Sequence, residues 1–356
     1  MSMDTETNNY VPRRLHRKPR RVGRVVLLAA LMVVVSVLGV GGAYASKIAG
    51  ALGQTQTWAD SDVVPTNSDR PWKDPGDKSM NILLLGADKS QSGETVSVES
   101  GGTDQRSDSM MLVHIPADRK NVYVISLMRD LWVDIPGHGH AKLNAAMQYG
   151  GVKLLWQTVE KITNTSVDHV AMVDFDAFRD LTNTIGGVTV DNPVAFCAYK
   201  TTPDVCFEKG KIEIQGQRAL KWVRERHAFL RGDYQRVANQ QQFLKQVFKK
   251  VLSPEVLGDP NKLVDTISSV TKYVTTDKGF DDPALQLGLL MQMKDLRSND
   301  IRSFTLHTLG TGTMGGQSVV LFDQQAATDL GNAMKTGTMD AYYKAAVAQE
   351  KADLGK

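Results

Sequence analysis

An uncharged apolar stretch near the N-terminus constrains this chain more than any other feature. Residues 25–45 read VVLLAALMVVVSVLGVGGAYA, 21 residues without a charged side chain. At about 1.5 Å per helical residue, this length matches the roughly 30 Å hydrocarbon core of a bilayer. The sequence therefore predicts one transmembrane helix. A secretory signal peptide is the alternative, because Ala43-Tyr44-Ala45 resembles a cleavage site, although its apolar region is usually only about 7–15 residues long.

The charges around this stretch predict its orientation. The basic segment RRLHRKPRRVGR immediately precedes it, and an excess of Lys and Arg normally stays on the cytoplasmic side. We therefore expect residues 1–24 to be a cytoplasmic tail and residues 46–356 to lie outside a cell membrane that the chain crosses once. The whole chain carries a net charge of only +3, much of it in this tail, so we expect no nucleic-acid partner.

The remaining composition is that of a globular protein. With 42% hydrophobic and 23% charged residues among 356, the chain can bury one large core or two modest ones. Residues 46–79 are polar, contain several Asp and Pro, and show no sustained period, which predicts a linker without core contacts. From residue 80 to 335, short apolar runs alternate with helical patterns, which predicts an α/β domain. Residues 336–356 predict a helical tail that frays after about residue 341.

The two cysteines flank a polar segment that contains a proline and has the composition of a surface loop. Outside the cytoplasm, a local disulfide between Cys197 and Cys206 is expected. Two unpaired thiols are the alternative, and two cysteines alone make a poor zinc site.

An arginine-rich segment, ALKWVRERHAFLRGDYQRVANQQQ, covers residues 219–242. Guanidinium groups match phosphate oxygens in pairs, so an excess of arginine over acid predicts a polyphosphate site. Asp233, Arg236 and Gln240 are spaced to share one face of a helix, and Asp233 stands where a carboxylate can cap it. Arg224 and Arg226 can reach one ligand only if the preceding helix ends near this point. A solvated helix face with ion pairs is the alternative.

Further charged residues stand at the ends of predicted strands. Asp88 follows NILLLG, Arg106 and Asp108 precede MMLVHI, and Arg129 follows NVYVISL. Two carboxylates beside phosphate-binding arginines are typical of a Mg²⁺ site. Lys142 begins a helical pattern, from which its ammonium group could reach an anion. His138 and His140 have no third metal ligand in view, so a loop is the preferred interpretation.

Several blocks of the sequence, in this order, resemble the LytR-CpsA-Psr family across about residues 80–335. They read NILLLGAD, RSDSMMLVHI, SLMRDLWVDIPGHGHAKLNAAMQYGG, VDFDAFRDLTNTIGGV, ALKWVRERH and GDYQRVANQQQFL. The resemblance implies a membrane-anchored, three-layer α/β/α domain with a central mixed sheet. It also implies a phosphotransferase that moves a glycopolymer, such as teichoic acid, capsule or another secondary wall polysaccharide, from a polyprenyl pyrophosphate carrier onto peptidoglycan. The lipid would lie in an apolar tunnel between sheet and helices.

The resemblance also implies roles for individual residues. Asp88 and Asp108 match carboxylates that hold Mg²⁺ and pyrophosphate. The positions implied to carry out catalysis are Arg129, Arg224, Arg226, Asp233 and Arg236. The positions implied to bind substrate are Arg106, Lys142 and Gln240. The Leu and Met residues at 287–293 suit plain core better than a tunnel wall. Two other functions remain open: a polyprenyl-pyrophosphate pyrophosphatase with water as acceptor, and a membrane-bound transcriptional attenuator.

Overall fold

The structure is a computed structural model that describes residues 46–66, 70–87, 109–198, 205–293 and 295–353. Contacts within the chain divide it into Met1–Ser46 and Lys47–Lys356, and almost all described residues belong to the second unit. The predicted membrane helix lies outside the described residues, as do Asp88, Arg106 and Asp108. Among the helices that are described, none is long and apolar enough to cross a bilayer.

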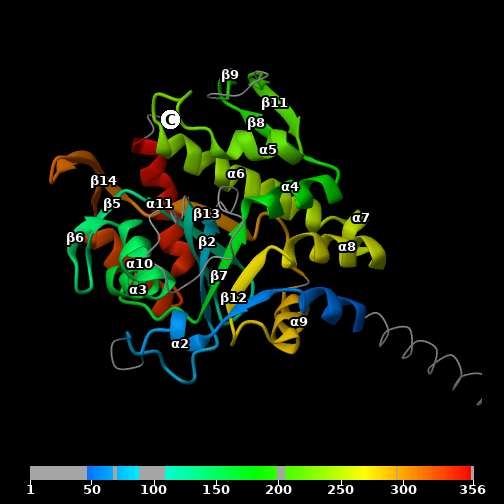
Figure 1. Cartoon of the computed structure of the whole chain (residues 1–356), viewed down its shortest axis with the longest axis horizontal. Coiled ribbons are helices and arrows are strands. Elements are labelled where there is room, and N and C mark those ends of the chain that lie inside the picture. The colour runs from blue at the N-terminus through cyan, green and yellow to red at the C-terminus, as the bar shows by residue number, and fades with distance from the viewer. Residues whose placement is uncertain (1–45, 67–69, 88–108, 199–204, 294, 354–356) are drawn as a thin grey trace, which may run out of the picture. The chain divides into compact units, whose positions relative to one another are not determined.

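A seven-stranded mixed sheet forms the centre of this unit, in the order β1-β12-β7-β2-β3-β4-β13 (Figure 1). Its strands are β1 (Gln56–Trp58), β12 (Val274–Asp277), β7 (His169–Asp174), β2 (Met80–Ala87), β3 (Ser109–Ile115), β4 (Val122–Leu127) and β13 (Ile301–Thr305). Strand β2 runs parallel to β7 and antiparallel to β3. The carboxyl ends of β2 and β7 therefore meet the start of β3 at one edge of the sheet.

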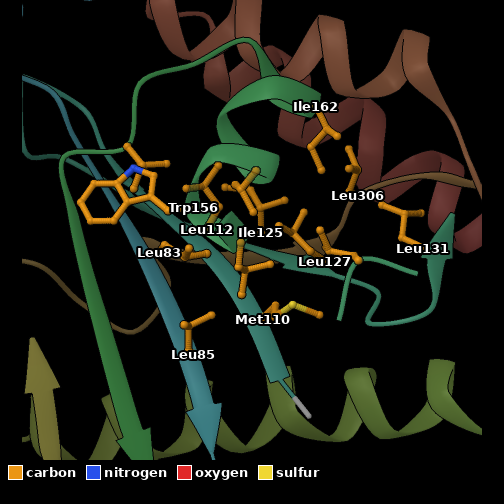
Figure 2. Packing of buried hydrophobic residues seen from close by; sticks show 14 of the residues in the cluster. Leu83, Leu85, Met110, Leu112, Ile125, Leu127, Leu131, Trp156, Ile162 and Leu306 are labelled. Atoms are coloured by element: carbon orange, nitrogen blue, oxygen red, sulfur yellow. The ribbon is translucent and has the colours of Figure 1, made fainter. Parts of the chain in front are cut away.

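Side chains alternate between the two faces of the sheet, as strand geometry requires. Leu83 and Leu85 of β2 point to one face, where α3 (Ala145–Thr163) contributes Trp156 (Figure 2). Helices α10 (Gln324–Thr336) and α11 (Met339–Asp353) cover the same face. Ile82 points to the other face, where it packs in a cluster that α6 (Asp233–Val251) joins. Helices thus cover both faces, and the predicted α/β/α class is confirmed.

The other elements surround this core. The remaining helices are α2 (Asp60–Val63), α4 (Phe175–Thr184), α5 (Gly216–Arg224), α7 (Pro254–Leu257), α8 (Pro260–Thr271) and α9 (Pro283–Gln292). A four-stranded sheet contains β14 (Thr308–Met314), β15 (Gln317–Phe322), β5 (Leu131–Ile135) and β6 (Gly139–Lys142). Two hairpins pair β8 (Val188–Asn192) with β11 (Gly210–Ile214), and β9 (Phe196–Cys197) with β10 (Cys206–Phe207). A disulfide joins Cys197 and Cys206 across the second hairpin.

The expectation that residues 46–79 make no core contact is wrong. Trp58 is only 7% exposed, and β1 adds to the edge of the central sheet by pairing with β12. Farther along, Arg70 Nη2 lies 2.8 Å from Glu160 Oε1. The apolar residues of this segment are too widely spaced to show a period, and strand pairing uses backbone groups, which leave no mark in a side-chain pattern. The segment is therefore part of the domain.

The C-terminal helix is also packed rather than frayed. Tyr343 lies edge-on to Phe304 with ring centroids 5.8 Å apart, and the Tyr342 hydroxyl donates to the Ala326 carbonyl at 2.9 Å. Val347, one turn beyond Tyr343, still contacts the core. The apolar stripe along α11 thus continues almost to the end of the helix.

Candidate functional site

Three arginines meet around one carboxylate, at the point where β4 ends and α6 begins. Arg129 Nε lies 2.8 Å from Asp233 Oδ2, and Arg236 Nη2 lies 3.3 Å from the same oxygen. Arg226 Nη1 lies 3.5 Å from Asp233 Oδ1. We call these four residues the arginine cluster. Residues far apart in the sequence therefore form one charged site, as the arginine-rich segment predicts.

The end of α5 brings Arg226 to this cluster. The helix stops at Arg224, and the next residue, Glu225, leaves the helical conformation. The Glu225 carboxylate accepts hydrogen bonds from the backbone N–H groups of Arg226, His227 and Ala228, at 2.9, 2.6 and 3.1 Å. The turn needed to separate Arg224 from Arg226 is thus present. Arg224, on the last turn of α5, has an exposed side chain, and its part in the site stays a prediction.

The start of α6 supplies the other side of the cluster. Asp233 and Arg236 stand one helical turn apart, and Gln240 follows on the same face, where all three line one pocket. Asp233 is expected from the sequence to cap α6, but the N-cap residue is Gly232, which has no side chain to cap the helix. The Asp233 carboxylate is instead engaged by the guanidinium groups, which are charged and therefore stronger partners than backbone amides.

The cluster carries a surplus of positive charge. Burial alone would raise the pKa of Asp233, but the guanidinium groups of Arg236, Arg129 and Arg226 outweigh it and hold that pKa below its usual value. Three arginines and one ionised aspartate leave a formal charge of 3 − 1 = +2. Like charges held this close favour an anion between them. The cluster therefore suits an anionic ligand.

Lys142 reaches the cluster indirectly, through an acid that the sequence patterns did not single out. Lys142 Nζ lies 3.1 Å from Asp130 Oδ1, and Arg129 Nε lies 3.6 Å from Asp130 Oδ2. The expectation that Lys142 begins a helix is wrong, because it ends β6 and α3 starts only at Ala145. Asp130 thus holds both cations in place beside the site.

Two pockets adjoin at the cluster. The first has a mixed lining, in which the charged residues Arg129, Asp233 and Arg236 stand beside Ser109, Met111 and Gln240, among others. The second is apolar, contains about 470 Å³ of space that is partly open to solvent, and lies between the central sheet and α6. It is lined by Leu84, Leu85, Gly86, Ser109, Met111, Val173, Val223, Gln240, Phe243 and Leu244. Ser109, Met111 and Gln240 belong to both pockets, so a charged space opens directly beside an apolar one.

The metal ligands predicted from the sequence attach to this same place. Asp88 directly follows β2 and Asp108 directly precedes β3, and the ends of those strands pair through Gly86 and Ser109. Gly86 and Ser109 both line the apolar pocket. Among the residues that the structure describes, no group of three His, Cys, Asp or Glu could hold a metal. His138 instead stacks on Tyr149, with ring centroids 4.8 Å apart.

The residues missed by sequence reasoning are of two kinds. Asp130 and Glu225 position arginines, and each stands next to an arginine in the sequence, a signal that could have been used. The apolar pocket had no such signal, because Val173 and Leu244 look like any buried strand or helix residue. None of the described residues at 287–293 lines either pocket.

Comparisons with known proteins find relatives across most of the described domain. The LytR_cpsA_psr family matches residues 47–336. Three relatives are named polyisoprenyl-teichoic acid–peptidoglycan teichoic acid transferases. TagT of Bacillus subtilis (strain 168) is 36% identical over 205 residues, which are 56% of this chain and 61% of the relative. TagU of Enterococcus faecalis is 33% identical over 204 residues, which are 57% and 63% of the two chains. TagU of Bacillus cereus (strain AH820) is 30% identical over 262 residues, which are 70% and 81%. The match thus spans less than two thirds of the first two relatives.

Solved structures show the same fold. Protein gbs0355 from Streptococcus agalactiae has a TM-score of 0.62 and 27% identity, covering 73% of this chain and 87% of that one. TagV of B. subtilis has a TM-score of 0.59 and 26% identity, covering 73% and 97%. A structure of TagT bound to LIIa-WTA has a TM-score of 0.56 and 26% identity, covering 75% and 94%. Because the family match covers most of its length and begins where the packed structure begins, this chain belongs to the LytR_cpsA_psr family.

Proposed function

We propose that this protein transfers a glycopolymer from a polyprenyl pyrophosphate carrier onto peptidoglycan. The observation that carries the proposal is the shared wall of the two pockets at Ser109, Met111 and Gln240. A molecule with an anionic head and a long apolar tail fits that arrangement, because each part finds a matching surface. The names of the relatives TagT and TagU describe transfer of teichoic acid from polyisoprenyl-teichoic acid to peptidoglycan, which supports the proposal.

The chemistry follows from where charge develops. A sugar hydroxyl of peptidoglycan attacks the sugar-linked phosphorus, a new P–O bond forms, and the bond to the bridging oxygen breaks, releasing polyprenyl phosphate. Negative charge grows on the bridging and equatorial oxygens during this step. Arg129 and Arg236 line the space where those oxygens would lie, Arg226 approaches it through Asp233, and fixed positive groups there would stabilise the transition state. Asp233 reduces the repulsion among the three arginines.

Asp233 is poorly suited to accept the proton of the attacking hydroxyl. Its pKa is held low by the three guanidinium groups, and a weak base removes a proton inefficiently. Its contribution is therefore to position the arginines.

Magnesium is the cofactor that we propose for this site. Asp88 and Asp108 would hold it, since both attach to paired strand ends beside the pocket of the arginine cluster. When bound, the ion would neutralise part of the pyrophosphate charge. Gln240, which Ser109 Oγ contacts at 3.2 Å, would offer its amide group to the same ligand.

The apolar residues 25–45 would anchor the protein in the membrane that also contains its lipid carrier. In this proposal the N-terminus is cytoplasmic, the chain crosses the cell membrane once, and residues 46–356 lie outside. Lipid, protein and peptidoglycan acceptor then share one compartment.

One assay separates transfer from hydrolysis. The purified full chain in detergent is incubated with Mg²⁺, a short-chain polyprenyl pyrophosphate glycan and soluble peptidoglycan oligomers. We expect a phosphate-linked glycan on the oligomers, detected by mass spectrometry, and release of polyprenyl phosphate. Free glycan phosphate in equal amounts with and without oligomers would identify a pyrophosphatase instead.

A further inference from the structure

Helix α9 is apolar on all sides, yet little of it is buried. Its sequence, PALQLGLLMQ, contains no charge and only two glutamines as polar residues. Among its described side chains only Leu289 is buried, and Met291 is 59% exposed. A helix that is apolar all round is normally enclosed by protein or by lipid. In the part of the chain that the structure describes, α9 is only half covered, and Ala284 and Met291 stay exposed.

The start of the packed domain lies close to this helix. Residues 46–52 are helical, and Ile48 and Ala51 are buried against the domain. The Thr271 hydroxyl donates to the Ala51 carbonyl at 2.8 Å. A few residues later, the Thr55 hydroxyl donates to the Asp281 carboxylate, next to the residue that caps α9. Figure 1 shows this N-terminal segment, in blue, running past α9.

These contacts limit how far α9 can be from the membrane. The predicted membrane helix ends at Ala45, directly before the packed segment. Seven helical residues and the turn that follows them span at most about 20 Å between Ser46 and Thr55. Ile48 and Ala51 are buried, so this segment is fixed to the domain. With residues 25–45 across the bilayer, as in the proposed function, the bilayer surface would lie within about 20 Å of Thr55, which contacts Asp281 just before α9.

The residues that flank α9 belong to the same apolar cluster as part of the apolar pocket. Phe280, before the helix, and Met293, after it, pack on the cluster that covers the second face of the sheet. Leu84 and Leu244 pack on the same cluster and line the apolar pocket. Both ends of α9 are therefore anchored to the cluster that borders this pocket.

From these observations we propose that α9 rests on the lipid bilayer and inserts its exposed side chains into it. The inference rests on the proposed function, in which the carrier's tail is membrane-bound. A surface helix of this kind enters the lipid by about 5–10 Å, between headgroups and acyl chains. The carrier's tail can then pass from bilayer to pocket without crossing water, which an apolar chain avoids.

The position of α9 can be measured with tryptophan fluorescence. Met291→Trp is placed in the full chain, which is reconstituted into vesicles with and without lipids brominated on the acyl chains. Leu309→Trp is the matched control, because Leu309 is 62% exposed but lies on β14, on the opposite side of the view in Figure 1. The emission added at position 291 should fall by about half or more with brominated lipid, since bromine quenches only groups that enter the acyl region. The emission added at position 309 should not change.

Equal quenching at both positions, or none at 291 in vesicle-bound protein, would overturn the proposal. Failure of the full chain to insert into vesicles would overturn it as well. A second measurement uses Met291→Glu and Ala284→Glu, which keep the helix exposed but add charge. We expect about tenfold lower turnover of carrier held in vesicles and unchanged turnover of a short-chain carrier in solution. If the unsubstituted protein turns over neither carrier, the proposed function is refuted instead. The quenching experiment would still show whether α9 lies in the bilayer.

Discussion

Asp233 contacts three guanidinium groups at distances between 2.8 and 3.5 Å, so its own charge is more than neutralised. This geometry decides between the two interpretations of the arginine-rich segment. A solvated helix face would hold its arginines apart in water, whereas Arg129 and Arg236 are largely enclosed and line one pocket, and Arg226 joins them at Asp233. The convergence is a property of single residues, and substitutions of single residues can test it.

Arg226→Ala should lower transfer by about 10²-fold or more, an effect near 3 kcal/mol on the transition state. Its folded stability should change little, because the Arg226 side chain is 37% exposed. Arg226→Lys should recover activity only in part, since lysine keeps the charge and loses the paired geometry. Turnover and melting temperature are measured together, with Arg297→Ala as control, because Arg297 hydrogen-bonds to the backbone of its own loop. A rate loss that merely follows unfolding would contradict the assignment.

Asp88→Ala and Asp108→Ala should each weaken the dependence of turnover on Mg²⁺, because the remaining carboxylate alone holds the ion less tightly. Binding of Mg²⁺ alone, measured by calorimetry on the folded protein, should weaken in parallel. Asp118→Ala, in the turn between β3 and β4, is the matched control. Full activity of either variant in EDTA would show that transfer does not require Mg²⁺.

His114 should make the protein less stable in mild acid. Burial lowers the pKa of His114 from 6.5 to about 4. The unfolded chain therefore binds a proton as pH falls below 6.5 while the folded protein does not, and stability is lost progressively down to about pH 4, by about 3 kcal/mol in total. Urea unfolding between pH 7 and pH 5 should show this slope, and His114→Gln should flatten it. The exposed His138→Gln should keep it, and identical slopes in both variants would refute the assignment.

At the level of elements, prediction succeeded where side-chain pattern and structure coincide. The strands before Asp88 and Arg129 are continuous apolar runs, and α6 begins at Asp233 where Gly232, with φ of 48°, breaks the chain direction. Prediction failed for elements whose place in the fold depends on backbone pairing or on packing against residues distant in the sequence. Strand β1 pairs through its backbone with β12, more than 200 residues away, and the stripe on α11 becomes meaningful only beside Phe304. The apolar pocket could not be predicted, because its lining residues are ordinary core residues until the fold leaves a space between them.

The packed segment before β2 gives a prediction about truncation. A chain that begins at Lys47 should unfold cooperatively with full stability. A chain that begins at Met80 should lose at least about 3 kcal/mol of unfolding free energy, because it lacks Trp58 and leaves the buried carboxylate of Glu160 without Arg70. Urea denaturation of the two proteins provides the comparison. Equal midpoints would restore the linker interpretation for residues 46–79.

At the scale of the whole molecule, the protein places three environments in sequence. Helix α9 lies next to the start of the packed chain, the apolar pocket lies between the second face of the sheet and α6, and the pocket of the arginine cluster shares a wall with it. A lipid with a charged head could place its apolar tail against α9 and the apolar pocket, and its head beside the arginine cluster. We infer that the two adjoining pockets hold the head and the tail of one carrier molecule.

That claim is tested most directly by measuring the affinity of two ligands for two variants. The ligands are inorganic pyrophosphate and a short polyprenyl pyrophosphate; the variants are Arg226→Ala, in the cluster, and Val173→Phe, which fills the apolar pocket. We predict that Arg226→Ala weakens both ligands by about tenfold or more, whereas Val173→Phe weakens only the lipid, because only the lipid has a tail. Val194→Phe, at an exposed position, should leave both affinities unchanged. Equal weakening of both ligands by Val173→Phe, or of neither, would contradict the account.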